Sequence, residues 1–170
     1  MLIVETGSGI VGADAYVDIP YVSAYLVGEQ QKAWEMLDEP EQEAAIIRAT
    51  RAVDVLYDWL GSRKTLDQGL SWPRFRVMFE GFKIEGVPAA VQKAAAEAVG
   101  LVLEGEEFFS NEADMEVASE RVDVIAVTYR VRQAGEKKEA TKFEALNRLV
   151  RGLCRTESRS GVGAARVERV

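Results

Sequence analysis

The strongest constraint on the fold is a helical pattern of apolar residues between positions 40 and 60. Small and apolar side chains recur there every three or four residues, which is the spacing of one face of an α-helix. Asp38 followed by Pro40 is a typical helix start, and Gly61 is a typical stop. The apolar positions form more than one stripe, so we expect a central helix with neighbours on several sides. We assign to its core Ala49, Val53, Leu56 and Trp59.

Three other segments show helical spacing. Residues 21–37 predict one or two short helices with an interruption at Gly28, and residues 142–153 predict a last helix. Residues 89–103, which follow Pro88, predict a helix whose face consists mostly of alanine. Small side chains of this kind let another helix approach closely, whether it comes from the same chain or from another subunit.

One segment has the pattern of a strand rather than a helix. Residues 121–131 alternate and are rich in β-branched side chains, which predicts a strand, and together with the preceding MEVASE (residues 115–120) we expect a hairpin that turns near Val122 and Asp123. The chain is therefore predicted to be mainly α: a small bundle of about four helices with a β-hairpin insertion and a flexible C-terminal tail. We place the helical domain at residues 1–153 and the tail at residues 154–170.

The composition removes most catalytic chemistry. The 170 residues contain no histidine, which is the commonest general base and metal ligand, and Cys154 is the only cysteine. No spacing of carboxylates singles out an acid–base pair. We therefore expect no enzyme, no catalytic residue, no metal and no cofactor. No apolar run reaches the length of a membrane span, so we expect a soluble intracellular protein without membrane contact.

The charge is distributed unevenly along the chain. The net charge is −7, yet residues 151–170 carry five arginines against two glutamates. Glycines and serines in this tail leave little apolar surface to bury, so we expect a partner to be needed to order it. Nucleic-acid phosphate and an acidic or grooved protein surface are two candidate partners, and an ordinary frayed chain end is the third interpretation.

The stretch DQGLSWPRF, residues 67–75, places a tryptophan and a proline in a long connection between helices. We expect Trp72 to pack into the bundle and fix the path of this loop, with Pro73 restricting the backbone. Arg74 could then reach a carboxylate such as Asp54 or Glu97. Stacking of a nucleic-acid base on a tryptophan is the other interpretation, but all three tryptophans stand among apolar residues in an acidic chain.

Several of these pieces, in this order, resemble a family of small tailed-bacteriophage proteins often labelled DnaT-like single-stranded-DNA-binding proteins. The resemblance covers roughly residues 4–153. It rests on the glycines and aromatic residues of positions 4–25, the central AIIRATRAVDVLYDWLGSR, the Trp72–Pro73–Arg74 triplet, VPAAVQKAAAEAV and SERVDVIAVTY. The chain departs from the family pattern at Asp123, where glycine is frequent, and in the tail from Arg155 onward.

The resemblance implies a structural virion protein, a head–tail connector or adaptor, rather than an enzyme. Such proteins assemble as a ring, typically of twelve copies, beneath the portal of the capsid and complete the head at the neck of the virion. The implied partners are other copies of the chain, the portal protein and a downstream tail or stopper protein, while genomic DNA passes through the channel. The implied portal-docking residues lie in the tail and are Arg155, Arg159, Arg166 and Arg169. The alternative, which the family label suggests, is a module that binds single-stranded DNA.

Overall fold

The computed structural model describes residues 1–106, 108 and 143–155. Five helices lie within these residues, and they confirm the prediction of a mainly α chain. They are α1 (Ile19–Tyr25), α2 (Gly28–Glu35), α3 (Glu39–Leu56), α4 (Ala89–Leu103) and α5 (Glu144–Leu149). Four short strands lie between α3 and α4: β1 (Ser62–Arg63), β2 (Arg74–Phe75), β3 (Met78–Phe79) and β4 (Phe82–Lys83). No helix of the described residues is long and apolar enough to span a membrane.

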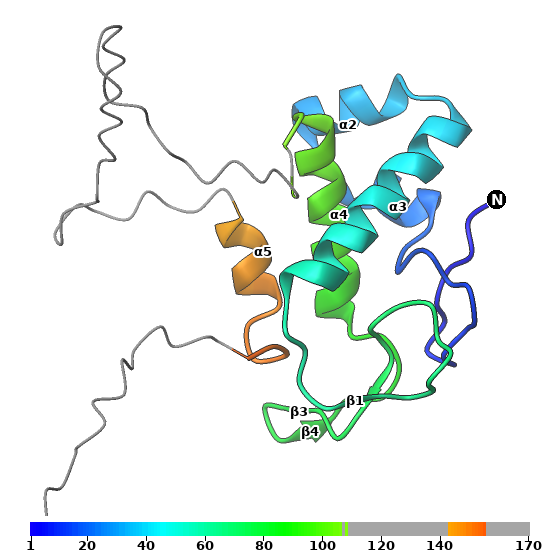
Figure 1. Ribbon diagram of the computed structural model, residues 1–170. Helices are drawn as coiled ribbons and strands as arrows, with labels where there is room; N and C mark the ends of the chain where they lie inside the picture. Colours follow the sequence, from blue (N-terminus) through cyan, green and yellow to red (C-terminus); the bar gives the residue numbers. More distant parts are fainter. Residues whose placement is uncertain (107, 109–142, 156–170) are drawn as a thin grey trace, which may run out of the picture.

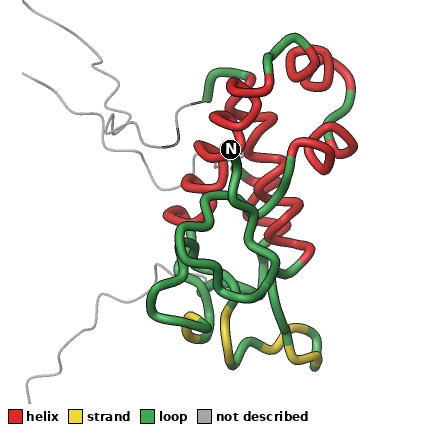
Figure 2. Tube along the Cα trace, turned by 90° about the vertical axis from the view of Figure 1, so that its right-hand side faces the viewer, coloured by secondary structure: helices red, strands yellow, loops and turns green. Residues whose placement is uncertain are grey.

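The bundle is built on the packing of α3 against α4, with α1, α2 and α5 packed on α4 as well. Figure 1 shows α2 at one end of the bundle and the strands at the opposite end. The view turned by 90° in Figure 2 again places the strands at one end of the molecule. The connection between α3 and α4 therefore forms a separate end of the molecule.

The start of α3 follows from its first residues. The side chain of Asp38 accepts a hydrogen bond from the backbone nitrogen of Glu41 (2.9 Å), and the side chain of Glu41 accepts one from the backbone nitrogen of Asp38 (3.0 Å). This reciprocal pair is a capping box, and Pro40 stands in the first turn. The predicted helix start is thus correct.

The end of α3 differs from the prediction. The helix stops at Leu56, and the backbone is extended at Tyr57. Ala49 and Val53 are fully buried as expected, but Leu56 is 37% exposed and its assignment to the core was wrong. Trp59 lies beyond the helix, yet it is buried and packs its ring 5.4 Å from that of Tyr57. The turn at Tyr57 thus brings Trp59 into the core in place of Leu56.

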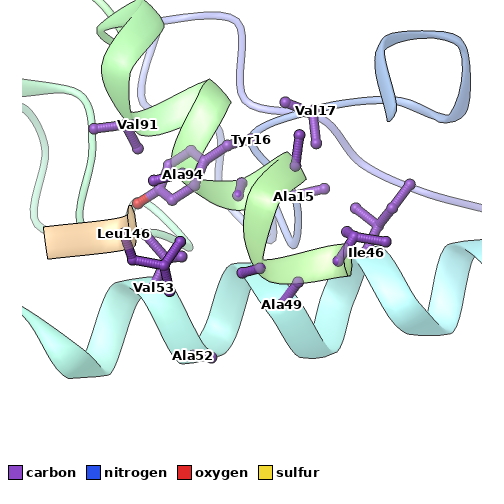
Figure 3. Packing of buried hydrophobic residues seen from close by; sticks show 14 of the residues in the cluster. Ala15, Tyr16, Val17, Ile46, Ala49, Ala52, Val53, Val91, Ala94 and Leu146 are labelled. Carbon is purple, nitrogen blue, oxygen red and sulfur yellow. The ribbon is translucent and has the colours of Figure 1, made fainter. Parts of the chain in front are cut away.

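The alanine face of α4 packs inside the chain. Ala94, Ala95 and Ala98 are fully buried, and α4 makes its most extensive contact with α3. Figure 3 shows the side chains between α3 and α4, with Ala49 and Val53 on one helix and Ala94 on the other. Tyr16 from the N-terminal segment and Leu146 from α5 complete the layer. The sequence predicted that this face packs against a helix of the same chain or of another subunit, and here α3 of the same chain packs against it.

The β-structure of the described residues lies in the connection that the sequence suggested to be irregular. β1 pairs with β2, and β3 pairs with β4, both in antiparallel orientation. The hairpin predicted near Val122 and Asp123 lies outside the described residues. Residues 154 and 155 pair with the segment that follows α3. Cys154 forms an isolated antiparallel β-bridge with Trp59 through the backbone, and the backbone nitrogen of Arg155 donates to the carbonyl oxygen of Asp58 (2.7 Å).

Candidate functional site

The loop before β2 is fixed by the burial of Trp72 and Pro73. Trp72 is fully buried, and its ring meets that of Trp59 edge to face, with centroids 5.8 Å apart. Its backbone nitrogen donates a hydrogen bond to the hydroxyl oxygen of Tyr16 (3.1 Å). Trp34 is buried too, and its indole nitrogen donates to the hydroxyl of Ser23 (2.9 Å). None of the three tryptophans therefore offers a face on which a base could stack.

Asp54 on α3 holds the same loop from the other side. Its carboxylate accepts hydrogen bonds from the hydroxyl of Tyr16 and from the backbone nitrogen of Ser71 (2.8 Å). Burial raises the pKa of the Asp54 carboxyl, although these hydrogen bonds act in the opposite direction. Burial and the adjacent carboxylate also raise the pKa of the Tyr16 phenol. Tyr16 and Asp54 hydrogen-bond to each other and to backbone nitrogens of the loop before β2, so we assign a structural role to this pair.

Arg74 does not pair with a carboxylate, contrary to our expectation. Its guanidinium donates to four backbone carbonyl oxygens, those of Leu60 (2.7 Å), Gly61 (2.8 Å), Ser71 (3.2 Å) and Trp59 (3.3 Å). The two proposed partners have other donors, since Asp54 accepts from Tyr16, and Glu97 accepts from the hydroxyl of Tyr25 (3.0 Å). Three of these carbonyls follow α3 in the chain, and that of Ser71 lies in the loop before β2, so Arg74 joins the two segments.

The N-terminal glycine loop encloses a carboxylate of its own chain. The buried side chain of Glu5 accepts hydrogen bonds from the backbone nitrogens of Gly7 (2.8 Å), Gly9 (2.9 Å) and Ile10 (2.6 Å). Gly7 has a φ of 98°, and a Cβ at this position would lie 2.9 Å from the Cα of Gly86. These amide groups are therefore already occupied by Glu5, and glycine is required where the loop meets the end of the α3–α4 connection.

The exposed end of the α3–α4 connection combines aromatic and basic side chains. Phe75 and Phe82 are 48% and 75% exposed, and Met78 is exposed as well. Four exposed cationic side chains stand in the same strands or next to them. We name this surface the basic–aromatic tip, and it consists of Arg63, Lys64, Phe75, Arg76, Met78, Phe82 and Lys83.

A tight hairpin presents the outer part of the tip. Phe79 pairs with Phe82, and the two turn residues between them, Glu80 and Gly81, both have positive φ angles. Two consecutive residues of this kind form the type I′ turn that suits a two-residue hairpin loop. A Cβ at Gly152, in the turn after α5, would lie 3.0 Å from the ring of Phe79. Phe79 thus rests against the bundle, whereas Phe82 remains exposed.

The cations of the tip are largely available to a ligand. The side chains of Arg63 and Arg76 form no hydrogen bond or ion pair with a described residue. Lys83 pairs with Glu85 (2.9 Å), but both side chains are mostly exposed, so the pair is weak. The ammonium group of Lys64 donates to the carbonyl oxygen of Gly7 (2.9 Å), and the charges of Lys83 and Lys64 together lower the pKa of the Glu85 carboxyl.

The tip differs in charge from the rest of the bundle. Residues 61–87 contain five Lys and Arg against three Asp and Glu, whereas residues 1–60 contain three against eleven. Residues 1–60 are thus acidic and the α3–α4 connection is basic, so an anionic ligand would be attracted to the tip rather than to residues 1–60.

The structure places the predicted site residues in three different ways. The loop residues Trp72, Pro73 and Arg74 lie inside or beside the core. Arg155 is exposed and lies 3.4 Å from the carboxylate of Asp58, while the other three tail arginines lie outside the described residues. The sequence prediction did not identify the tip. The signal was the run RFRVMFEGFK, in which aromatic and basic residues alternate around a Glu-Gly turn.

Comparisons with known proteins give one match. A search of curated proteins and a search of solved structures found no similar entry. A family model with the description "Putative DnaT-like ssDNA binding protein" matches residues 1–170. This match spans the whole chain, and it agrees with the resemblance carried by the helical pattern, the Trp-Pro-Arg loop and the N-terminal glycines. The chain belongs to this DnaT-like family.

Proposed function

We propose that this protein binds single-stranded DNA through its basic–aromatic tip. The observation that carries the proposal is the exposure of Phe75 and Phe82 among four cationic side chains, at the basic end of an acidic domain. The description of the family to which the chain belongs names the same class of ligand.

The chemistry of the tip suits a single strand. Unpaired bases stack on exposed aromatic rings, and each such contact contributes about 1–3 kcal/mol with little dependence on sequence. Lysine and arginine side chains bind the phosphates between the bases. The acidic residues of the body keep the strand at the tip, because they repel phosphate from the other surfaces.

The test is a fluorescence-anisotropy titration of labelled oligo-dT with the wild-type chain and with Phe75→Ala/Phe82→Ala. We expect the double variant to bind at least about fivefold more weakly, which corresponds to the loss of about 1 kcal/mol of stacking. Met36→Ala is the matched control, since Met36 is 87% exposed and follows α2 at the other end of the bundle. Equal affinity of all three proteins would contradict the proposed site, and the absence of binding by the wild type would contradict the function.

We propose a second function, a head–tail adaptor of a tailed bacteriophage that forms a ring below the portal. Its support is the ordered series of sequence pieces that resembles such proteins, together with the acidic helical body. A ring of acidic subunits would repel DNA phosphate, so that the genome slides through the channel. The tail arginines, Arg155, Arg159, Arg166 and Arg169, are the residues that we propose to dock on the portal.

A deletion of residues 156–170 tests the adaptor function. The deletion starts after Arg155 because Leu153 is buried and Arg155 is hydrogen-bonded to Asp58, so the bundle should stay folded. We expect the full chain to co-purify with portal-containing heads and the truncated chain to lose this attachment. Normal attachment of the truncated chain would exclude Arg159, Arg166 and Arg169 as docking residues. Failure of the full chain to attach would exclude the adaptor function.

A further inference from the structure

We propose that the basic–aromatic tip binds DNA at the junction between a single strand and a duplex, rather than along a uniform single strand. This inference rests on the proposed binding of single-stranded DNA and specifies the form of DNA that the same tip prefers.

The first argument is the shape of the tip. Proteins that hold a continuous single strand do so in a basic groove that follows the backbone. Figures 1 and 2 place the strands that carry the tip at one end of the molecule, outside the helices. The hairpin turn is open on its outer side, since a Cβ at Gly81 would have no atom within 4 Å. The tip therefore projects and does not enclose a strand.

The second argument is the number of exposed rings. Phe75 and Phe82 can stack on one or two bases, which is too few to hold several consecutive nucleotides. The last base pair of a duplex presents two paired, coplanar bases as one flat apolar face where the single strand begins. Aromatic and apolar side chains, such as Phe82 and Met78 here, are the types that proteins place against base steps as wedges.

The third argument is the position of the charges. Arg63 and Lys64 belong to β1 or follow it, Arg76 follows β2, and Lys83 lies in β4, so cations accompany both strand pairs of the tip. A junction has three phosphate backbones around its last base pair, those of the two duplex strands and of the single-stranded extension. Cations in several positions can contact all three at the same time. The acidic residues 1–60 would oppose further contact along the duplex.

The test compares three labelled DNAs at the same salt concentration. The first is (dT)20, the second is a relaxed, covalently closed circular duplex without ends or unpaired segments, and the third is a hairpin duplex with one single-stranded dT tail. We expect the tailed hairpin to bind at least about fivefold more tightly than (dT)20, and the closed duplex to bind more weakly than either. The Phe82→Ala variant should bind the tailed hairpin and (dT)20 with equal affinity. The Met36→Ala variant should keep the preference for the tailed hairpin. Thermal melts of both variants would verify that they fold.

The outcomes separate this inference from the proposed function. If (dT)20 and the tailed hairpin bind equally, the junction preference is wrong while single-strand binding stands. A preference for the junction that survives Phe82→Ala would also overturn the inference, because the wedge would then not be responsible. If neither DNA binds, both the inference and the proposed function fail.

Discussion

The hydroxyl group of Tyr16 donates a hydrogen bond to the carboxylate of Asp54 and so joins the N-terminal segment to α3. The oxygen atoms of both residues then accept the backbone nitrogens of the loop before β2: Asp54 accepts that of Ser71, and Tyr16 that of Trp72. This pair therefore determines where the chain leaves the core on its way to the basic–aromatic tip.

Removal of the Tyr16 hydroxyl should destabilise the fold. Tyr16→Phe leaves a partly buried carboxylate and a buried backbone nitrogen each with one partner fewer, which should lower the free energy of unfolding by about 1–3 kcal/mol. Urea denaturation measures the change. Tyr21→Phe is the control, since Tyr21 is only partly buried and its hydroxyl makes no hydrogen bond with a described residue. An equal decrease in the free energy of unfolding of both variants would show that the hydrogen bond between Tyr16 and Asp54 adds no measurable stability.

The buried tyrosines predict a loss of stability at alkaline pH. Burial raises the pKa of Tyr16 above its ordinary value of 10, and burial with the nearby Glu97 raises that of Tyr25 to about 12. Above pH 10 the unfolded chain therefore releases phenol protons that the folded chain retains, so the free energy of unfolding falls as the pH rises. We expect Tyr16→Phe to lose less stability than the wild type between pH 9 and pH 11, relative to its own value at pH 8. Parallel pH profiles of the two proteins would contradict this assignment.

Trp72 should be one of the most costly residues to truncate. Trp72→Ala removes a fully buried ring that contacts Trp59, which typically costs about 3–5 kcal/mol. Chemical denaturation would measure the loss. Phe82→Ala, at an exposed ring, should change the stability by no more than about 0.5 kcal/mol. A Trp72→Ala protein as stable as the wild type would mean that the loop is not fixed by this side chain.

Arg74 and Arg76 form a matched pair for a charge-conserving substitution. Arg74→Lys keeps the charge but replaces the planar guanidinium by an ammonium group that cannot reach four carbonyl oxygens. We therefore expect the free energy of unfolding to fall by about 1–3 kcal/mol. Arg76→Lys should be neutral for stability because its guanidinium binds no described residue. If Arg74→Lys proved equally neutral in urea denaturation, the carbonyl contacts would have no net stabilising effect.

The helical part of the fold could be predicted because its signals are local. The capping sequence at Asp38 and the periodic alanines of α4 are each contained within a few turns of helix. Leu56 was assigned wrongly because periodicity gives the side of a helix on which a residue lies, but not where the covering chain ends. The partners of Arg74 could not be predicted either, because the carbonyl groups that it binds become available only through the turn after α3.

The candidate site itself was not predicted, and the reason is tertiary. Phe75, Phe79 and Phe82 lie within eight residues of one another, and their packing in the fold distinguishes the half-buried Phe79 from the two exposed rings. The sequence analysis considered the tryptophans as the possible stacking residues, and the structure buries all three. The exposed aromatic surface is therefore supplied by phenylalanine.

The most direct test of the central claim is a map of the DNA contact by NMR. Amide chemical shifts of the ¹⁵N-labelled chain would be followed during titration with oligo-dT. We predict that the shift changes concentrate at residues 61–65 and 74–85 and are lost in Phe75→Ala/Phe82→Ala. Shift changes centred on α3, α4 or the tail with none at the tip, or an unchanged spectrum at saturating DNA, would contradict the proposed function.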